Sequence, residues 1–82
     1  MNYADIGTFL RILREQRKIS QETAAAVIGI SDRTLRNIES GVTRAEIETL
    51  FKLCDLYSIS GEELWFFYEQ NTDMQEELKL YE

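Results

Sequence analysis

A short stretch in the first half of the chain constrains the fold more than any other. Ser20 precedes a segment of helical character, and its hydroxyl can accept from a free backbone N–H at a helix start. Gly29 follows that segment, where a left-handed backbone conformation would end the helix at little cost. Helices that cross at a tight turn need small side chains, which Ala24 and Ala25 supply. The stretch therefore predicts two short helices packed across a turn over residues 21–41.

Helical periodicity also marks the rest of the chain, which contains no proline. Apolar residues recur at three- and four-residue spacing, and no alternating strand pattern competes with them. The predicted helices cover residues 5–17, 21–28 and 31–39, a segment ending near 57, and a segment from 60 to 68. Ser31 is the expected N-cap of the third helix. The fourth has an ambiguous start, because Thr43 with Glu46 makes a capping-box pattern while Glu46 could itself lie in the first turn. Ser60 with Glu63 is a second such pattern.

These patterns predict an all-α fold of five helices in one domain, residues 1–68. Residues 69–82 form an acidic extension, expected to be short and either helical or partly ordered, with a possible part in dimerisation. A domain this small buries only about 60 to 65% of the surface that its unfolded chain exposes. An interface shared by two copies would therefore add needed stability.

The formal charge of -6 is unevenly distributed along the chain. Residues 11–44 hold seven basic and four acidic side chains, a charge of +3, whereas the remainder holds two basic residues and eleven carboxylates, a charge of -9. An acidic protein is a poor ligand for nucleic acid in general. A polarised chain can still present one basic face to DNA.

Several functional classes are disfavoured by the residue content. The chain has no histidine and no glycine-rich phosphate loop, so we expect neither an enzyme nor a bound metal or cofactor. Cys54 is the only cysteine and lies on the apolar face of the predicted fourth helix, where a lone thiol packs as a small apolar residue. No apolar run reaches the length of a membrane span, and no secretory signal opens the sequence. We expect a cytoplasmic location.

The order of these motifs resembles the lambda-repressor-like, Xre-type helix-turn-helix family. The likeness extends from Leu10-Arg11-x-Leu13-Arg14 through Ile19-Ser20-Gln21-Glu22 to Glu62-Glu63-Leu64. It implies a five-helix DNA-binding domain with its helix-turn-helix at 21–41. It also implies that the third helix lies in the major groove while the second crosses the phosphate backbone.

Carried over by position, the resemblance assigns base contacts to Asp32, Arg33, Arg36 and Asn37. Arginine can donate two hydrogen bonds to guanine O6 and N7, and asparagine can pair in the same way with adenine N6 and N7. Arg33 and Asn37 are therefore the leading specificity residues. Asp32 could accept from a cytosine N4 amine, or could serve only to interact with the helix dipole.

The resemblance also assigns contacts with the DNA backbone. Gln21 and Thr34, with the free N–H groups at the start of the second helix, match positions that contact phosphate. Lys18 and Arg44 would add positive charge at the edges. The loop at residues 42–45 has fewer basic residues than is common in the family. The resemblance therefore implies a weaker affinity of the protein for the DNA phosphate backbone.

Two further groups of residues are expected to be structural. By resemblance, Arg14 and Glu39 form a partly buried salt bridge that holds the first and third helices in register. Four consecutive aromatic residues lie near the carboxyl end: Trp65, Phe66, Phe67 and Tyr68. One helix face cannot bury all four on its own monomer, so either a second subunit or a neighbouring segment of the same chain covers them.

Two functions remain open at this point. The first is a sequence-specific regulator of transcription, a repressor, that binds a palindromic operator in double-stranded DNA as a homodimer. The second is a protein-interaction module, antitoxin-like or regulatory, that keeps the fold with weak DNA binding and uses its acidic carboxyl-terminal half to bind a protein partner.

Overall fold

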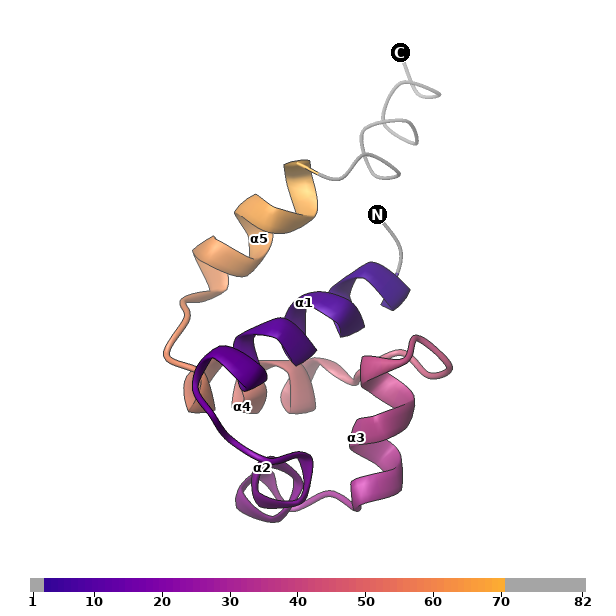
Figure 1. Ribbon diagram of the computed structural model, residues 1–82. Coiled ribbons are helices and arrows are strands. Elements are labelled where there is room, and N and C mark those ends of the chain that lie inside the picture. The colour runs from indigo at the N-terminus through magenta and orange to yellow at the C-terminus, as the bar shows by residue number, and fades with distance from the viewer. Residues whose placement is uncertain (1–2, 71–82) are drawn as a thin grey trace.

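The computed structural model describes the backbone of residues 3–70 and the side chains of that range apart from residues 3–5 and 68. Its helices are α1 (Tyr3–Gln16), α2 (Gln21–Ile28), α3 (Asp32–Glu39), α4 (Ile47–Leu56) and α5 (Gly61–Gln70). The described part contains no strand, so the predicted all-α fold of five helices is confirmed. Figure 1 shows α1 to α4 around a common centre, with α3 on one side and α5 rising from the other. The predicted extension lies outside the described residues from 71 onward.

Local capping explains where α2 and α3 begin and end. The Ser20 Oγ accepts from the backbone N–H of Thr23 at 3.0 Å, and Gly29 ends α2 with a φ of 80°. Ser31 Oγ accepts in the same way from the N–H of Thr34 at 3.0 Å. The bounds predicted for α2 and the caps predicted for both helices are confirmed. Because these bonds join neighbouring residues, the sequence alone specifies them.

The start of α4 differs from both predicted alternatives. Helix α4 begins at Ile47, and Glu46 occupies the N-cap position without a capping hydrogen bond from its side chain. The backbone N–H groups of Val42 and Thr43 both donate to the carbonyl oxygen of Asn37, at 2.9 and 3.2 Å. These bonds hold the loop against the end of α3. The capping-box prediction at this place is wrong, because Glu46 and not Thr43 is the N-cap of α4.

The start of α5 follows its prediction. The Ser60 Oγ accepts from the N–H of Glu63 at 3.0 Å, and the Glu63 carboxylate accepts in return from the N–H of Ser60 at 3.1 Å. This reciprocal capping box satisfies two backbone donors at the helix end. The helix then runs to Gln70, two residues beyond the predicted domain boundary.

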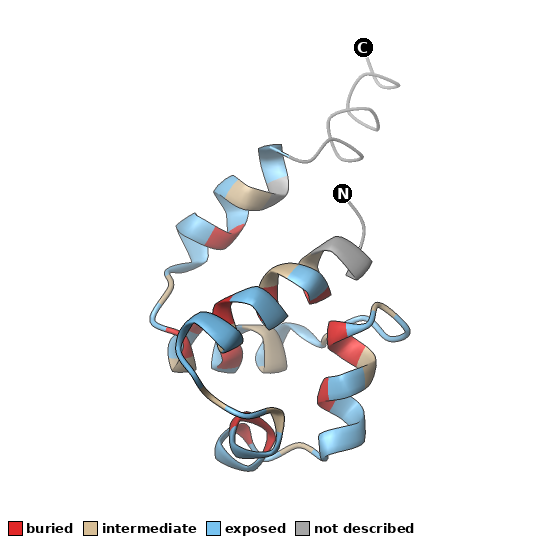
Figure 2. Ribbon diagram, viewed as in Figure 1, coloured by how far each residue is buried: buried red, intermediate tan, exposed pale blue. Residues whose placement is uncertain are grey.

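The core lies where α1, α2, α3 and α4 meet. Leu10 of α1, Leu35 of α3, and Leu53 and Tyr57 at the end of α4 are fully buried there. Burial of each such side chain contributes about 2 kcal/mol of transfer free energy. Because the four side chains come from α1, α3 and α4, their burial holds these helices around one core. Figure 2 shows the buried segments turned toward this centre and the exposed segments of α3 turned away from it.

Within residues 3–70, none of the helices combines the length and the apolar character needed to cross a membrane.

Candidate nucleic-acid interface

Helix α3 divides into a buried side and an exposed side. Leu35 and Ile38 are buried in the core, and Glu39 is buried at the carboxyl end. The residues predicted to read bases occupy the other side: Asp32, Arg33 and Arg36 are exposed and Asn37 is half-buried. A short helix anchored by two leucine-sized side chains thus presents a polar face to solvent, and Figure 2 shows the exposed side of α3.

The amino end of α3 shows what its first residues do. The capping hydrogen bond comes from Ser31, and Asp32 is the first helical residue, where a carboxylate interacts favourably with the helix dipole. The Thr34 hydroxyl lies 2.8 Å from the Ser31 hydroxyl. Thr34, predicted to contact phosphate, is therefore exposed and held in place by the cap.

Asn37 anchors the loop that follows α3. Its carbonyl oxygen accepts the two backbone bonds from Val42 and Thr43, and the Ser40 hydroxyl donates to it at 3.3 Å. These contacts use only the main chain of Asn37. Asn37 itself is half-buried, and its contact with a base stays a prediction.

An ion pair joins α1 to the end of α3. Arg14 Nε donates to Glu39 Oε2 at 2.8 Å, and Arg14 Nη2 donates to Glu39 Oε1 at 3.0 Å. The side chains are 11% and 3% exposed, so this two-bond pair is largely shielded from water. The hydrogen bond with Glu39 raises the pKa of Arg14, and the guanidinium remains charged. The structure thus brings together the two residues predicted to form a structural pair.

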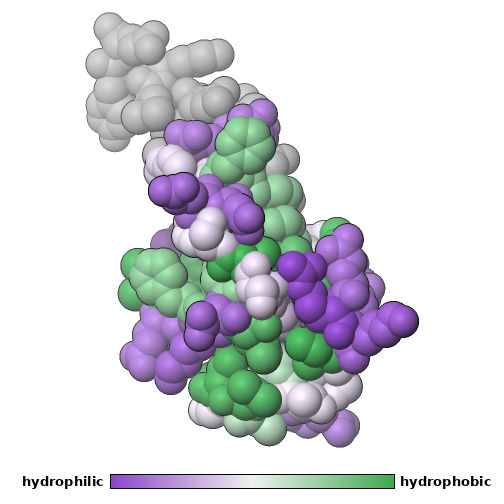
Figure 3. Space-filling model, turned by 90° about the vertical axis from the view of Figure 1, so that its left-hand side faces the viewer, coloured by the Kyte–Doolittle hydropathy of each residue, from purple (hydrophilic) through white to green (hydrophobic). Residues whose placement is uncertain are grey.

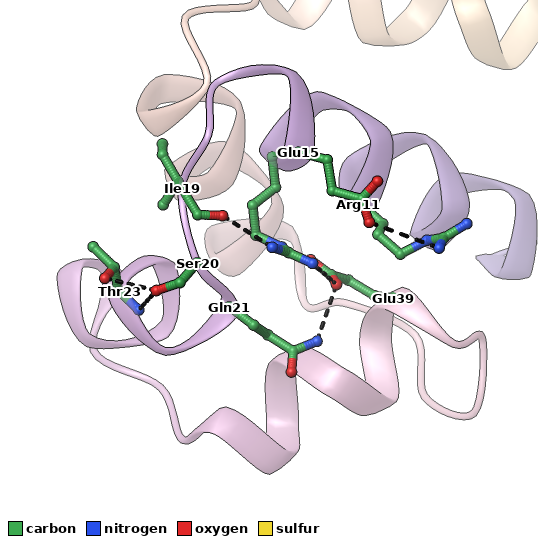
Figure 4. A network of polar contacts seen from close by, with 8 residues as sticks. Arg11, Glu15, Ile19, Ser20, Gln21, Thr23 and Glu39 are labelled. Atoms are coloured by element: carbon green, nitrogen blue, oxygen red, sulfur yellow. Dashed lines mark hydrogen bonds and ion pairs between the residues drawn. The ribbon is translucent and has the colours of Figure 1, made fainter.

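Two further bonds extend this network to the start of α2. Arg14 Nη1 donates to the carbonyl oxygen of Ile19 at 2.9 Å, and Gln21 Nε2 donates to Glu39 Oε1 at 3.0 Å. Figure 4 shows Gln21 and Glu39 pointing toward each other across the space between α2 and α3. One N–H of the Gln21 amide is therefore engaged within the chain.

The predicted edge residues lie on opposite sides of the molecule. Lys18 is exposed in the connection between α1 and α2, with a left-handed φ of 57°. Arg44 is exposed in the connection between α3 and α4. Figure 1 separates these two connections by the width of the domain, so the structure does not gather Lys18 with the residues of α3.

Gly7 is a residue that the sequence reasoning missed. A Cβ atom at this position of α1 would overlap the carbonyl oxygen of Ile38 and lie 3.0 Å from that of Glu39. The absence of a side chain therefore lets α1 approach the end of α3 directly. A glycine inside a helix with regular apolar spacing is the signal that could have indicated this contact.

Tyr57 adds a buried polar group close to the same network. Its side chain is fully buried, and among the described residues its hydroxyl has no hydrogen-bond partner. Burial, with a smaller effect of the Glu39 charge and an opposing effect of Arg14, raises the pKa of Tyr57 to about 12. Its backbone carbonyl accepts from Arg17 Nε at 2.8 Å, which ties the ends of α1 and α4 together.

The aromatic residues of α5 divide between the chain's own core and its surface. Phe67 stacks on Phe9 of α1, with ring centroids 4.0 Å apart and planes inclined by 9°. Trp65 and Phe66 are 49% and 63% exposed. Part of the cluster is thus covered within the chain, and part remains at the surface. The side chain of Tyr68 lies outside the described part.

Helix α2 packs across a tight turn against α3, and α3 exposes a polar face. The other three helices support this pair. This arrangement defines the helix-turn-helix class of DNA-binding domains. A family model described as helix-turn-helix (HTH_3), of the lambda-repressor and Xre-like type, matches residues 10–64. The chain belongs to this family of DNA-binding regulators. No curated protein matches it significantly.

Proposed function

We propose that this protein is a transcriptional repressor that binds a palindromic operator as a homodimer, with α3 in the major groove. The observation that supports this most directly is the exposed face of α3, which carries Arg33 and Arg36 on a helix fixed at both ends. Ser31 fixes its amino end, and the Arg14–Glu39 pair fixes its carboxyl end. Side chains that read base edges need such a rigid support.

Arg33 is the main specificity residue in this proposal. It lies in the first turn of α3, the part of a recognition helix that meets base edges, and its side chain is exposed. A guanidinium in that place can donate two bonds to guanine. Asn37, one turn later, is the proposed reader of adenine.

The charge distribution agrees with this orientation. Figure 1 shows α5 rising from the side of the domain opposite α3, and α5 opens with Glu62 and Glu63. Turning this acidic end away from DNA reduces its repulsion by the phosphates. The acidic character of the chain as a whole is then compatible with binding through α3.

The proposed dimer surface combines Trp65 and Phe66 of α5 with Ile47 and Phe51 of α4. The two α4 residues are 70% and 55% exposed, and Phe51 lies beside the start of α5 at Gly61. On the side of the molecule seen in Figure 3, hydrophobic patches lie on the body of the domain and along the rising column of α5. A second copy that covers these residues would bury apolar surface. Binding to a palindrome requires the two α3 helices of such a dimer to lie about one helical turn of DNA apart.

One observation favours the alternative function. Trp65 and Phe66 share α5 with exposed Glu62, Glu63 and Glu69, and aromatic residues framed by carboxylates also suit the binding of a basic protein partner. In this alternative the fold is kept and DNA binding is weak.

Selection from a random duplex library at low salt separates the two functions. The wild-type protein is expected to enrich a palindrome, and Arg33→Ala is expected to enrich a site with one position relaxed in each half. Lys52→Ala is the control for loss of a positive charge outside α3, since Lys52 pairs with Glu48 at 3.3 Å on α4. Because Lys52 borders Ile47 and Phe51 of the proposed dimer surface, the oligomeric state of this variant is compared with that of wild type. Failure of the wild type to enrich any site would favour the protein-interaction module.

A further inference from the structure

A polar hollow of about 360 Å³ opens between α1, the start of α2 and the second half of α3. The residues that line it are Thr8, Arg11, Gln21, Arg36, Glu39 and Ser40. Three segments distant in sequence therefore converge on one place, immediately beside the exposed face of α3. No function assigned so far uses this hollow as a unit.

The hollow is positively charged although Glu39 forms part of its wall. The Glu39 carboxylate is neutralised by the two bonds from Arg14 and accepts a third from Gln21. Arg11 has an ion pair with Glu15 at 3.8 Å, but these side chains are 49% and 57% exposed, so water screens the pair strongly. Arg36 is exposed. The two guanidinium groups thus supply charge that the wall does not cancel.

The hydrogen-bond donors around the hollow suit a phosphate group. Guanidinium groups bind phosphate oxygens through paired N–H donors. The second N–H of the Gln21 amide and the free backbone N–H groups of the first turn of α2 lie at the same edge. Figure 4 shows Arg11 and Gln21 on different sides of Glu39, which places donors on two walls.

Arg36 differs from the proposed base-reading residues Arg33 and Asn37 in that it lines the hollow. Successive residues of an α-helix are about 100° apart around the axis, so Arg36 and Asn37 cannot face the same direction. Arg36 lines the hollow with residues of α1 and α2, whereas neither Arg33 nor Asn37 is among its lining residues. The side of α3 that carries Arg36 is the side that faces the backbone-crossing helix.

We propose that the hollow holds one phosphate of the DNA backbone, with Arg11 and Arg36 as the two cationic groups that clamp it. This inference rests on the proposed function, and it assigns a DNA contact to Arg11. It also moves Arg36 from base reading to backbone binding. The clamp supplies the phosphate contact that the sparsely basic loop after α3 lacks.

The test is the salt dependence of DNA binding. Fluorescence anisotropy measures it on the selected operator and on a shuffled duplex of equal length. Arg11→Gln, Arg36→Gln and the double variant are compared with wild type and with Lys52→Gln. Each single variant is expected to weaken binding by the same factor on both duplexes. Each single variant should nearly keep the slope of log K against log salt, because the remaining arginine still neutralises the shared phosphate. Because the arginines share one phosphate, the double variant should lose about 1 and not 2.

The result that overturns the clamp is an Arg36→Gln protein with an altered base preference, which would make Arg36 a base reader and leave the proposed function standing. A loss of 2 in the double variant would also overturn it, since each arginine would then have its own phosphate. A wild-type protein that binds neither duplex would overturn the proposed function itself. Urea unfolding of every variant confirms that the comparison is made between folded proteins.

Discussion

Gly7 of α1 packs directly against the carbonyl oxygen of Ile38 at the end of α3, in a space that would not admit a methyl group. This contact joins the first helix to the recognition helix through backbone atoms alone. The Arg14–Glu39 pair joins the same two helices through side chains. The orientation of α3, and with it the proposed DNA-binding face, therefore depends on both contacts.

Gly7→Ala is expected to destabilise the domain by about 1 to 3 kcal/mol, because the added methyl group forces α1 away from α3. Helix propensity alone predicts the opposite sign, a gain of about 1 kcal/mol. Gly61→Ala is the matched control, since a Cβ there would meet only Phe51 at 3.9 Å. Urea unfolding measures both, and a Gly7→Ala protein as stable as wild type would show that the contact is loose.

Glu39→Gln is expected to cost about 3 kcal/mol, because it leaves the Arg14 guanidinium largely buried without its anion. Replacement of both partners by methionine should cost less than the single change, since two apolar side chains leave no unpaired charge. Chemical unfolding of the single and double variants checks this. A double variant less stable than Glu39→Gln would mean that the charges are not the source of the effect.

Tyr57→Phe is expected to be neutral or to stabilise the domain by up to about 1 kcal/mol at neutral pH, because the buried hydroxyl gains no hydrogen bond in the described part. The variant should also resist alkali better than wild type. Burial raises the pKa of Tyr57 to about 12, so its contribution is complete below pH 10 and is lost as the pH rises from about 10 to 12.

The difference in unfolding free energy between wild type and Tyr57→Phe, followed across that pH window, isolates this group from the other tyrosines. A pKa shift of about 2 corresponds to about 3 kcal/mol. Parallel stability curves for the two proteins between pH 9 and about pH 12 would show that Tyr57 ionises as freely in the folded state as in the unfolded chain.

Ser58→Gly is expected to stabilise the domain by about 1 kcal/mol, because Ser58 follows α4 with a left-handed φ of 59° that glycine adopts without strain. The N–H of the next residue, Ile59, donates to the carbonyl oxygen of Cys54 at 2.9 Å, which holds this conformation in place. Thermal unfolding gives the shift in Tm. Ser58→Ala, which keeps a Cβ, should show no such gain, and equal stabilisation by alanine would refute the backbone explanation.

Much of the fold could be predicted from local patterns. Ser20, Gly29 and Ser31 act on residues within a few positions of themselves, so the bounds of α2 and the caps of α3 follow from the sequence. The start of α4 could not be predicted in this way. Its N-cap, Glu46, makes no capping bond with its side chain, and the loop before it bonds back to the carbonyl oxygen of Asn37, a contact that no local pattern indicates.

The candidate site shows the same division. The polar face of α3 follows from the spacing of Leu35 and Ile38, which turn inward. The hollow beside α3 could not be predicted, because Arg11 and Arg36 line one hollow only after α1 and α3 have packed. The Phe9–Phe67 stack is likewise a contact between distant segments, and it covers part of the aromatic cluster within one chain.

The central claim is that Arg33 reads a base from the first turn of α3. The most direct test is a set of anisotropy titrations of wild type and Arg33→Ala on the selected operator, on operators changed at one base pair in each half-site, and on random DNA. We predict that Arg33→Ala loses about 1 to 3 kcal/mol on the operator, loses the preference at one position, and binds random DNA much as wild type does. An Arg33→Ala protein that binds the operator with wild-type affinity and the same base preferences would contradict the account.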